Sequence, residues 1–281
     1  MASAIPAFKD IVIYTGHDGF RGPYQDRIKK RVAMFKELYP GKVMTVAGED
    51  LVGILKGLDL LSTLLVIPPG ESTDLDKVFS PEEIAFLMEC FKKGMRGYVT
   101  CGSAYWVSKT RIYRGLCKVQ PSDTTSIVKE SVLPLFQGTA DGPLCPFPAA
   151  QYKVGFYSAA VSVSDGTNEC NIFLGGGGSF LPHADEKVKV LAKYTLAELE
   201  KRNKTKEWEN AAIMVPVGLG GVILSMFHPY YDSTDINVEL YEQTFPNCGT
   251  NWREVHAKLS PHEVRMAFVY KMLRQLEELA F

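Results

Sequence analysis

Hydrophobic and polar residues follow two alternating patterns over the first hundred residues. Short apolar runs, rich in β-branched residues, have the length of strands: residues 11–14, 42–47, 64–67 and 97–100. Longer amphipathic segments between them predict helices: residues 24–38, 49–56 and 81–93. Strands that alternate with helices are typical of βαβ units. We therefore expect an α/β fold, a three-layer sandwich with a mostly parallel central sheet.

Capping patterns mark the beginning of two helices. Ser80 is followed directly by Pro81 and, three residues on, by Glu83, which predicts a helix start. The same pattern at residues 260–263 predicts the start of the last helix. That helix carries one apolar stripe: Val264, Phe268, Met272 and Leu276.

Beyond residue 110 the predicted strands are shorter and are broken by Gly and Pro. Residues 137–148 resemble a loop, and two longer strands follow at 211–217 and 222–227. The run Gly175-Gly-Gly-Gly178 indicates positive φ or close backbone approach, or else a flexible hairpin loop. Without repeats or a long linker, we expect one main domain, residues 1–235. Residues 236–281 form a helical extension that packs on it or binds a protein partner.

Charge and hydropathy narrow the classes of partner. The 31 Lys and Arg residues almost balance the 32 Asp and Glu residues, for a net charge of −1, so no overall field attracts nucleic acid or anionic lipid. No segment has the roughly 18 consecutive apolar residues of a membrane span, and the first residues do not resemble a signal peptide. We expect a cytoplasmic protein that acts on a small molecule, not on nucleic acid or a membrane.

The cysteines and histidines do not have the spacing of metal ligands. Six cysteines occur without a Cys-x-x-Cys pair, which fits a reducing compartment: Cys90, Cys101, Cys117, Cys145, Cys170 and Cys248. Four histidines are scattered: His17, His183, His256 and His262. We expect neither a metal nor a cofactor.

Cys101 is singled out by its place in the predicted fold. It follows strand 97–100 at the carboxyl edge of the parallel sheet, where ligands bind in such sheets. A thiol at a helix start meets the positive end of the helix dipole, which favours the nucleophilic thiolate. The N–H groups of Gly102 and, from the neighbouring loop, Gly70 can stabilise an oxyanion. An inert buried cysteine is the alternative.

The turn at Cys101 resembles a nucleophile elbow, in which small residues normally stand two positions before and after the nucleophile. Here Val99 precedes and Ser103 follows. Because Val99 is β-branched, we expect it to crowd the turn, leaving the elbow relaxed or differently shaped.

His228 is the candidate base for this cysteine. It ends the apolar strand 222–227 and reaches the same sheet edge. Tyr230 or Asp232, close behind it, can orient the ring. A structural hydrogen bond is the alternative role for a lone histidine.

Three stretches resemble the signature motifs of class I glutamine amidotransferase-like domains. They are Leu64-Leu-Val-Ile-Pro-Pro-Gly70, Gly97-Tyr-Val-Thr-Cys-Gly-Ser-Ala-Tyr105 and Leu224-Ser-Met-Phe-His-Pro229. More narrowly, roughly residues 10–232 resemble the amidotransferase-like N-terminal domain of eukaryotic-type biotin–protein ligases. The resemblance implies a flavodoxin-like fold, with the nucleophile at Cys101, the histidine at His228 and an oxyanion glycine at Gly70.

The chain departs from the family pattern at the positions that matter most. Pro69 stands where a second glycine is usual, and proline has no N–H to donate. Cys101-Gly-Ser103 replaces Cys-Ala-Gly, and His228-Pro-Tyr230 replaces His-Pro-Glu, so the orienting carboxylate is missing. No Gly-Arg-Gly-Arg-Gly adenylate loop is present, so we do not expect this chain alone to biotinylate. A Cys/His amidase or hydrolase and a catalytically impaired binding or regulatory module both remain open.

Overall fold

The computed structural model describes residues 8–16, 24–70, 72–114, 126–145, 158–244 and 249–279. Cys117, Cys248 and residues 146–148 of the expected loop lie outside these ranges. Within them, no helix combines the length and the apolar character needed to cross a membrane.

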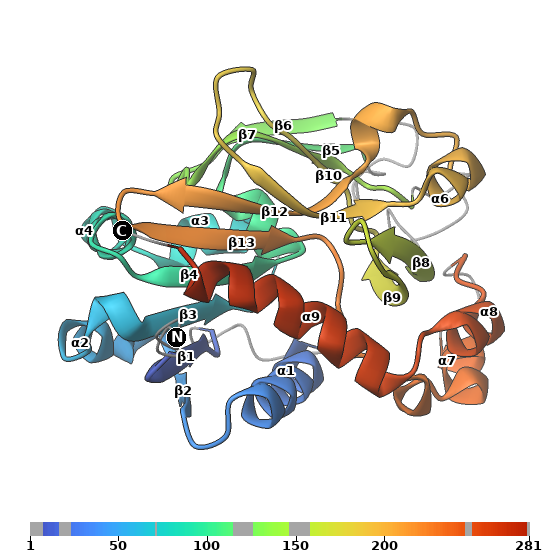
Figure 1. Cartoon of the computed structure of the whole chain (residues 1–281), viewed down its shortest axis with the longest axis horizontal. Coiled ribbons are helices and arrows are strands. Elements are labelled where there is room, and N and C mark those ends of the chain that lie inside the picture. Colours follow the sequence, from blue (N-terminus) through green and yellow to red (C-terminus); the bar gives the residue numbers. More distant parts are fainter. Residues whose placement is uncertain are drawn as a thin grey trace, which may run out of the picture.

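A nine-stranded sheet forms the centre of the protein, in the order β2-β1-β3-β4-β13-β12-β11-β8-β9 (Figure 1). Its strands are β1 (Asp10–Tyr14), β2 (Val43–Val46), β3 (Thr63–Ile67), β4 (Arg96–Thr100), β8 (Ser158–Ser164), β9 (Glu169–Gly175), β11 (Lys189–Tyr194), β12 (Asn210–Val217) and β13 (Gly220–Ser225).

The first part of this sheet is parallel and agrees with the sequence pattern. Neighbouring strands from β2 through β1, β3 and β4 to β13 all run in one direction, in the strand order of flavodoxin-like sheets. Every residue of β3 and β4 is buried, as expected for strands covered on both faces. The predicted helices are confirmed as α1 (Tyr24–Leu38), α2 (Gly48–Lys56) and α4 (Pro81–Lys92).

The central sheet as a whole is mixed, not mostly parallel. From β13 through β12, β11 and β8 to β9, every neighbouring pair is antiparallel. Short strands broken by Gly and Pro suit this arrangement, because antiparallel strands need only short connections. A second sheet has the order β10-β7-β5-β6 and contains residues 137–142, half of the stretch that we expected to be a loop. Its strands are β5 (Ser108–Arg114), β6 (Ser126–Glu130), β7 (Phe136–Gly142) and β10 (Ser179–Leu181).

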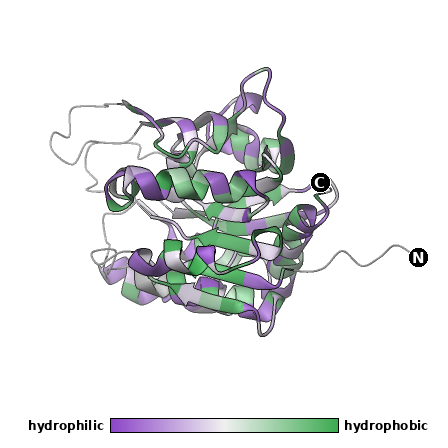
Figure 2. Ribbon diagram, turned by 90° about the vertical axis from the view of Figure 1, so that its left-hand side faces the viewer, coloured by the Kyte–Doolittle hydropathy of each residue, from purple (hydrophilic) through white to green (hydrophobic). Residues whose placement is uncertain are grey.

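Helices cover both faces of the parallel strands. On one face, Phe35 of α1 contacts Tyr98 of β4 with ring centroids 5.8 Å apart. On the other face, a Cβ at Gly97 would lie 2.8 Å from the Phe91 ring of α4, so glycine allows this helix to approach. Figure 2 shows the hydrophobic strands in the middle of the molecule. The remaining helices are α3 (Ser72–Val78), α5 (Gly102–Trp106), α6 (Leu196–Lys201), α7 (Val238–Thr244), α8 (Trp252–Lys258) and α9 (His262–Glu277).

The long helix α9 lies along the same side of the sheet as α1 (Figure 1). Phe268, Met272 and Leu276 of the predicted stripe are buried, whereas Val264 is 40% exposed. The predicted capping box at residues 260–263 is wrong. Pro261 occupies the N-cap and has no side-chain acceptor, while the Ser260 hydroxyl accepts a hydrogen bond from the N–H of Asn171 in β9.

Candidate functional site

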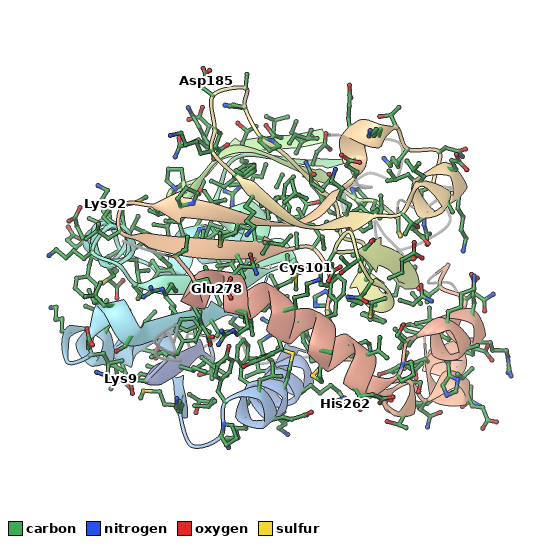
Figure 3. The ribbon with its side chains drawn as sticks, in the orientation of Figure 1. Lys9, Lys92, Cys101, Asp185, His262 and Glu278 are labelled. Atoms are coloured by element: carbon green, nitrogen blue, oxygen red, sulfur yellow. The ribbon has the colours of Figure 1, made fainter. Side chains whose placement is uncertain are left out.

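Cys101 lies between β4 and α5, at the carboxyl edge of the parallel strands (Figure 3). Its backbone has φ 52° and ψ −123°, a conformation that residues with a side chain rarely adopt. Among the non-glycine residues that the structure describes, only Asn203 also has a positive φ. Of the two outcomes expected beside Val99, a relaxed elbow is not observed, because the Cys101 backbone is strained; Val99 itself is buried. Such strain costs on the order of 1–3 kcal/mol and is typical of functional sites.

Bonds to two neighbouring strand ends fix this turn. The Cys101 N–H donates to the carbonyl of Ser225, the last residue of β13, at 2.7 Å. The hydroxyl of Ser103 donates to the carbonyl of Pro68, in the loop after β3. Ser103 is fully buried, so its hydroxyl connects the elbow helix to that loop.

The backbone N–H groups of Gly102 and Gly70 are the predicted oxyanion donors. Gly102 is the first residue of α5, and an N–H at that position has no acceptor within its helix. Gly70 is buried and ends the Pro68-Pro69-Gly70 loop after β3. The bond from Ser103 to Pro68 therefore joins the two segments that carry these donors.

The Cys101 thiol lies against the turn between β9 and β10. Its Sγ donates to the Gly175 carbonyl at 3.8 Å, a contact that suits a neutral thiol and not a thiolate. Cys101 is partly exposed, whereas burial raises the pKa of the Cys170 thiol and raises that of Cys90 to about 11. Of these three thiols, Cys101 is the one accessible to a reagent or substrate.

Tyrosines fix the glycine run beside this thiol. Gly176 and Gly177 have φ of 75° and 57°, which confirms the positive φ indicated by the sequence. The Tyr105 hydroxyl donates to the Gly177 carbonyl at 2.9 Å, and a Cβ at Gly178 would lie 2.0 Å from that hydroxyl. The Tyr194 hydroxyl donates to the Gly178 carbonyl at 2.8 Å. Burial raises the pKa of both tyrosines well above the ordinary value, so they remain neutral donors.

His228 follows β13 and is 1% exposed. Its backbone N–H donates to the Phe173 carbonyl at 2.8 Å, which forms an isolated β-bridge to β9. Its Nδ1 lies 2.7 Å from the Tyr230 hydroxyl. Since Phe173 and Gly175 both belong to the end of β9, that end contacts both His228 and Cys101. The structure thus brings the two predicted residues to one sheet edge.

Of the two candidate orienting groups, Tyr230 is the one that bonds the His228 ring. Asp232 makes no hydrogen bond to His228 in the described part of the chain. Its carboxylate accepts from the Arg265 guanidinium and from the Thr234 N–H at 3.1 Å. Burial alone would raise the pKa of Asp232, but the Thr234 N–H and the Arg265 charge together hold it below its ordinary value.

Sequence reasoning missed Arg265, which fixes the turn after His228 from α9. Its guanidinium is fully buried. Nη1 donates to the Pro229 carbonyl at 2.7 Å and to the Tyr231 carbonyl, and Nε donates to the Ser260 carbonyl at 2.8 Å. No sequence signal marks this residue, because an arginine on an amphipathic helix ordinarily faces solvent.

Arg31 of α1 was also missed. Its guanidinium lies over the Tyr230 ring, 4.7 Å from the centroid. It therefore contacts the residue that orients His228.

The side chains at this edge suit nucleophilic attack and proton transfer. Across the described ranges, no group of three or more His, Cys, Asp or Glu residues could hold a metal ion.

Comparison with known proteins places this arrangement in a family. The chain matches the family described as "Biotin-protein ligase, N terminal" over residues 55–279. It belongs to that family. Among curated proteins, none matches the chain.

Several solved structures resemble this chain at low identity. A glutamine amidotransferase is 17% identical, with 78% of this chain and 90% of that chain covered and a TM-score of 0.48. A ThuA-like protein from Bacteroides uniformis is 10% identical, with 81% of this chain and 85% of that chain covered and a TM-score of 0.45. A cytoplasmic protein from Salmonella typhimurium LT2 is 10% identical, with 95% and 99% covered and a TM-score of 0.43.

The family match corrects the extent of the resemblance seen in the sequence. It begins within α2 and runs through β3, the Cys101 turn and β13 to the end of α9. The sequence resemblance ended near residue 232, so it left out α9 and Arg265. In this member of the family, the C-terminal helix carries the residue that fixes the turn after His228.

Proposed function

We propose that this member of the biotin–protein ligase N-terminal family is a cysteine-dependent enzyme that hydrolyses a small amide or ester. The strained backbone of Cys101 carries the proposal, because such strain is retained where function requires it. The bond between His228 Nδ1 and Tyr230 supports it, since a general base must be oriented by a third group.

In the proposed reaction, the Cys101 proton passes to Nε2 of His228 and Sγ attacks the substrate carbonyl carbon. The carbonyl electron pair moves onto oxygen, where the N–H groups of Gly102 and Gly70 stabilise the negative charge. The bond to the amine or alcohol then breaks, and His228 returns the proton to this leaving group. Water attacks the resulting thioester, which releases the acid and restores the thiol.

Tyr230 limits the rate of this reaction. It fixes the orientation of the imidazole, but a neutral phenol does not stabilise the imidazolium as a carboxylate would. In addition, the Cys101 proton must leave the Gly175 carbonyl before it can reach His228. We therefore expect slower turnover than in an enzyme with a charged third member.

A catalytically impaired binding or regulatory module is the second candidate. The absence of an N–H at Pro69 and of a carboxylate at Tyr230 favours it. So does the contact of the Cys101 thiol with a carbonyl oxygen. The fold itself is compatible with either function.

Alkylation of Cys101 by iodoacetamide distinguishes the enzyme from the binding or regulatory module. The reaction is monitored by intact mass from pH 5 to pH 10. The parent protein carries Cys117→Ser and Cys248→Ser, since both cysteines lie outside the described residues. An enzyme should show a midpoint of alkylation below the value of about 8.5 for a free thiol. His228→Ala should remove this effect, and Cys101→Ser should abolish labelling. A midpoint that His228→Ala does not change would contradict the Cys/His pair.

Incubation with small amides and activated esters tests turnover itself. We expect an acyl adduct on Cys101 by intact mass, and loss of both adduct and product in Cys101→Ala. A compound that binds wild type and Cys101→Ala equally, without product, would instead identify a binding module.

A further inference from the structure

Arg31 is a fully buried cation that has no ion-pair partner among the described residues. Its Nη1 donates weakly to the Ile67 carbonyl, at 3.4 Å. Nε and Nη2 have no hydrogen-bond partner in the described part of the chain. The Tyr230 ring compensates only part of the charge. A buried guanidinium is normally paired, because removing an unpaired charge from water is very costly.

The two nitrogens without partners form one edge of the guanidinium. Nε–H and Nη2–H are parallel donors, and their spacing matches the two oxygens of a carboxylate. Arg31 therefore presents a complete bidentate edge. Water could accept these hydrogen bonds, but it would leave the positive charge uncompensated.

Two buried hydroxyls lie on the strand face beneath α1. Tyr98 and Thr100 are two residues apart on β4, so they share a face, and Tyr98 contacts Phe35 of α1. The Ser225 side chain lies close enough to the Tyr98 hydroxyl to lower its pKa, whereas the Thr100 hydroxyl has no hydrogen-bond partner within the described residues. Burial raises the pKa of Tyr98 and the Arg31 charge opposes this rise, so Tyr98 is a neutral donor within electrostatic reach of Arg31.

We propose that Arg31, with Tyr98 and Thr100, binds a small carboxylate beneath α1. Ile67 and Thr100 end β3 and β4, so the site lies at the edge where ligands bind in parallel sheets. A guanidinium edge and neutral hydroxyls together recognise both oxygens of one anion. This binding requires no reaction at Cys101, so it can be tested without any substrate.

Thermal unfolding in a carboxylate-free buffer tests the proposal. Sodium acetate, compared with sodium chloride at equal ionic strength, should raise the Tm of wild type along a saturating curve. The rise should reach several degrees at about a hundredfold excess over Kd. Acetamide, which is similar in shape but neutral, should have no effect. Arg31→Met should lose the response. Arg253→Met should keep it, because Arg253 is an exposed arginine paired with Glu242.

Three results would overturn the site. The first is an equal acetate response in wild type and Arg31→Met, and the second is a response to inorganic phosphate without one to acetate. The third is equal destabilisation by Arg31→Met and by Glu71→Gln. Glu71 is the acidic residue nearest to Ile67 in sequence, and it lies outside the described ranges. In chloride alone, Arg31→Met should be at least as stable as wild type, since it removes an unpaired charge. Equal destabilisation by Arg31→Met and Glu71→Gln would mean that the chain's own carboxylate pairs with Arg31.

Discussion

Replacing Arg265 by methionine should destabilise the protein and loosen the turn that follows β13. The buried guanidinium donates to the carbonyls of Pro229 and Tyr231 and to the carboxylate of Asp232. Methionine fills a similar volume but donates no hydrogen bond, so these acceptors lose their partner.

The magnitude follows from the burial of the two charges. Removing one partner of a buried ion pair costs about 3–5 kcal/mol. The Asp232 side chain is 25% exposed, so water can solvate its carboxylate when Arg265 is removed, and the lower end of this energy range applies. We expect a loss of about 3 kcal/mol, which corresponds to a Tm lowered by about 6–12 °C for a chain of this size.

Urea unfolding of Arg265→Met, fitted for midpoint and m-value, measures this loss. Arg265→Lys retains the charge without the planar donor edges and should lose less. Arg253→Met controls for the loss of a surface arginine. In a double-mutant cycle, Asp232→Asn and Arg265→Met should be strongly non-additive. A loss below about 1 kcal/mol for Arg265→Met, or additive effects in the cycle, would refute the reasoning.

Two further predictions concern packing and acid stability. Gly178→Ala should cost about 1–3 kcal/mol, because its Cβ would lie 2.0 Å from the Tyr105 hydroxyl. A Cβ at Gly53 in α2 meets no atom within 4 Å, so Gly53→Ala should stabilise the protein by about 0.5–1 kcal/mol. Thermal unfolding of both variants therefore tests the clash with the Tyr105 hydroxyl. The pKa of Glu254 is lowered from 4.5 to about 2, chiefly by the hydrogen bond from Lys258. The stability that this carboxylate contributes is therefore complete above pH 4.5 and is lost as the pH falls toward 2. In urea titrations, Glu254→Gln should reduce the fall in the free energy of unfolding between pH 4.5 and pH 2. The same fall as in wild type would contradict this prediction.

The parallel strands could be located from sequence because both their faces are covered. β3 is apolar throughout, and α1 shows the amphipathic period of a helix packed on one side. β7 gave no such signal, since its buried and exposed residues are mixed and it contains Gly138 and Gly142. These glycines resemble loop residues in sequence. In the structure, a Cβ at Gly142 would lie 1.8 Å from the Tyr105 hydroxyl.

At the site, Cys101 and His228 could be predicted because each follows an apolar strand. The choice between Tyr230 and Asp232 could not, because it depends on Arg265, which binds Asp232 from 33 residues away. The strain at Cys101 was likewise not predicted, since a β-branched residue at position 99 led us to expect a relaxed or differently shaped turn.

Tyr230 links the proposed reaction to the proposed carboxylate site, because it contacts both His228 and Arg31. Glutamate at this position would place a charge beside the His228 ring and give Arg31 a partner of its own. We therefore expect Tyr230→Glu to speed alkylation of Cys101 at pH 7 and to remove the rise in Tm caused by acetate. Tyr230→Gln has nearly the same shape without the charge, so it should do neither. If Tyr230→Glu speeds alkylation but leaves the acetate response intact, the Nε/Nη2 edge of Arg31 faces away from Tyr230, and the two sites act separately.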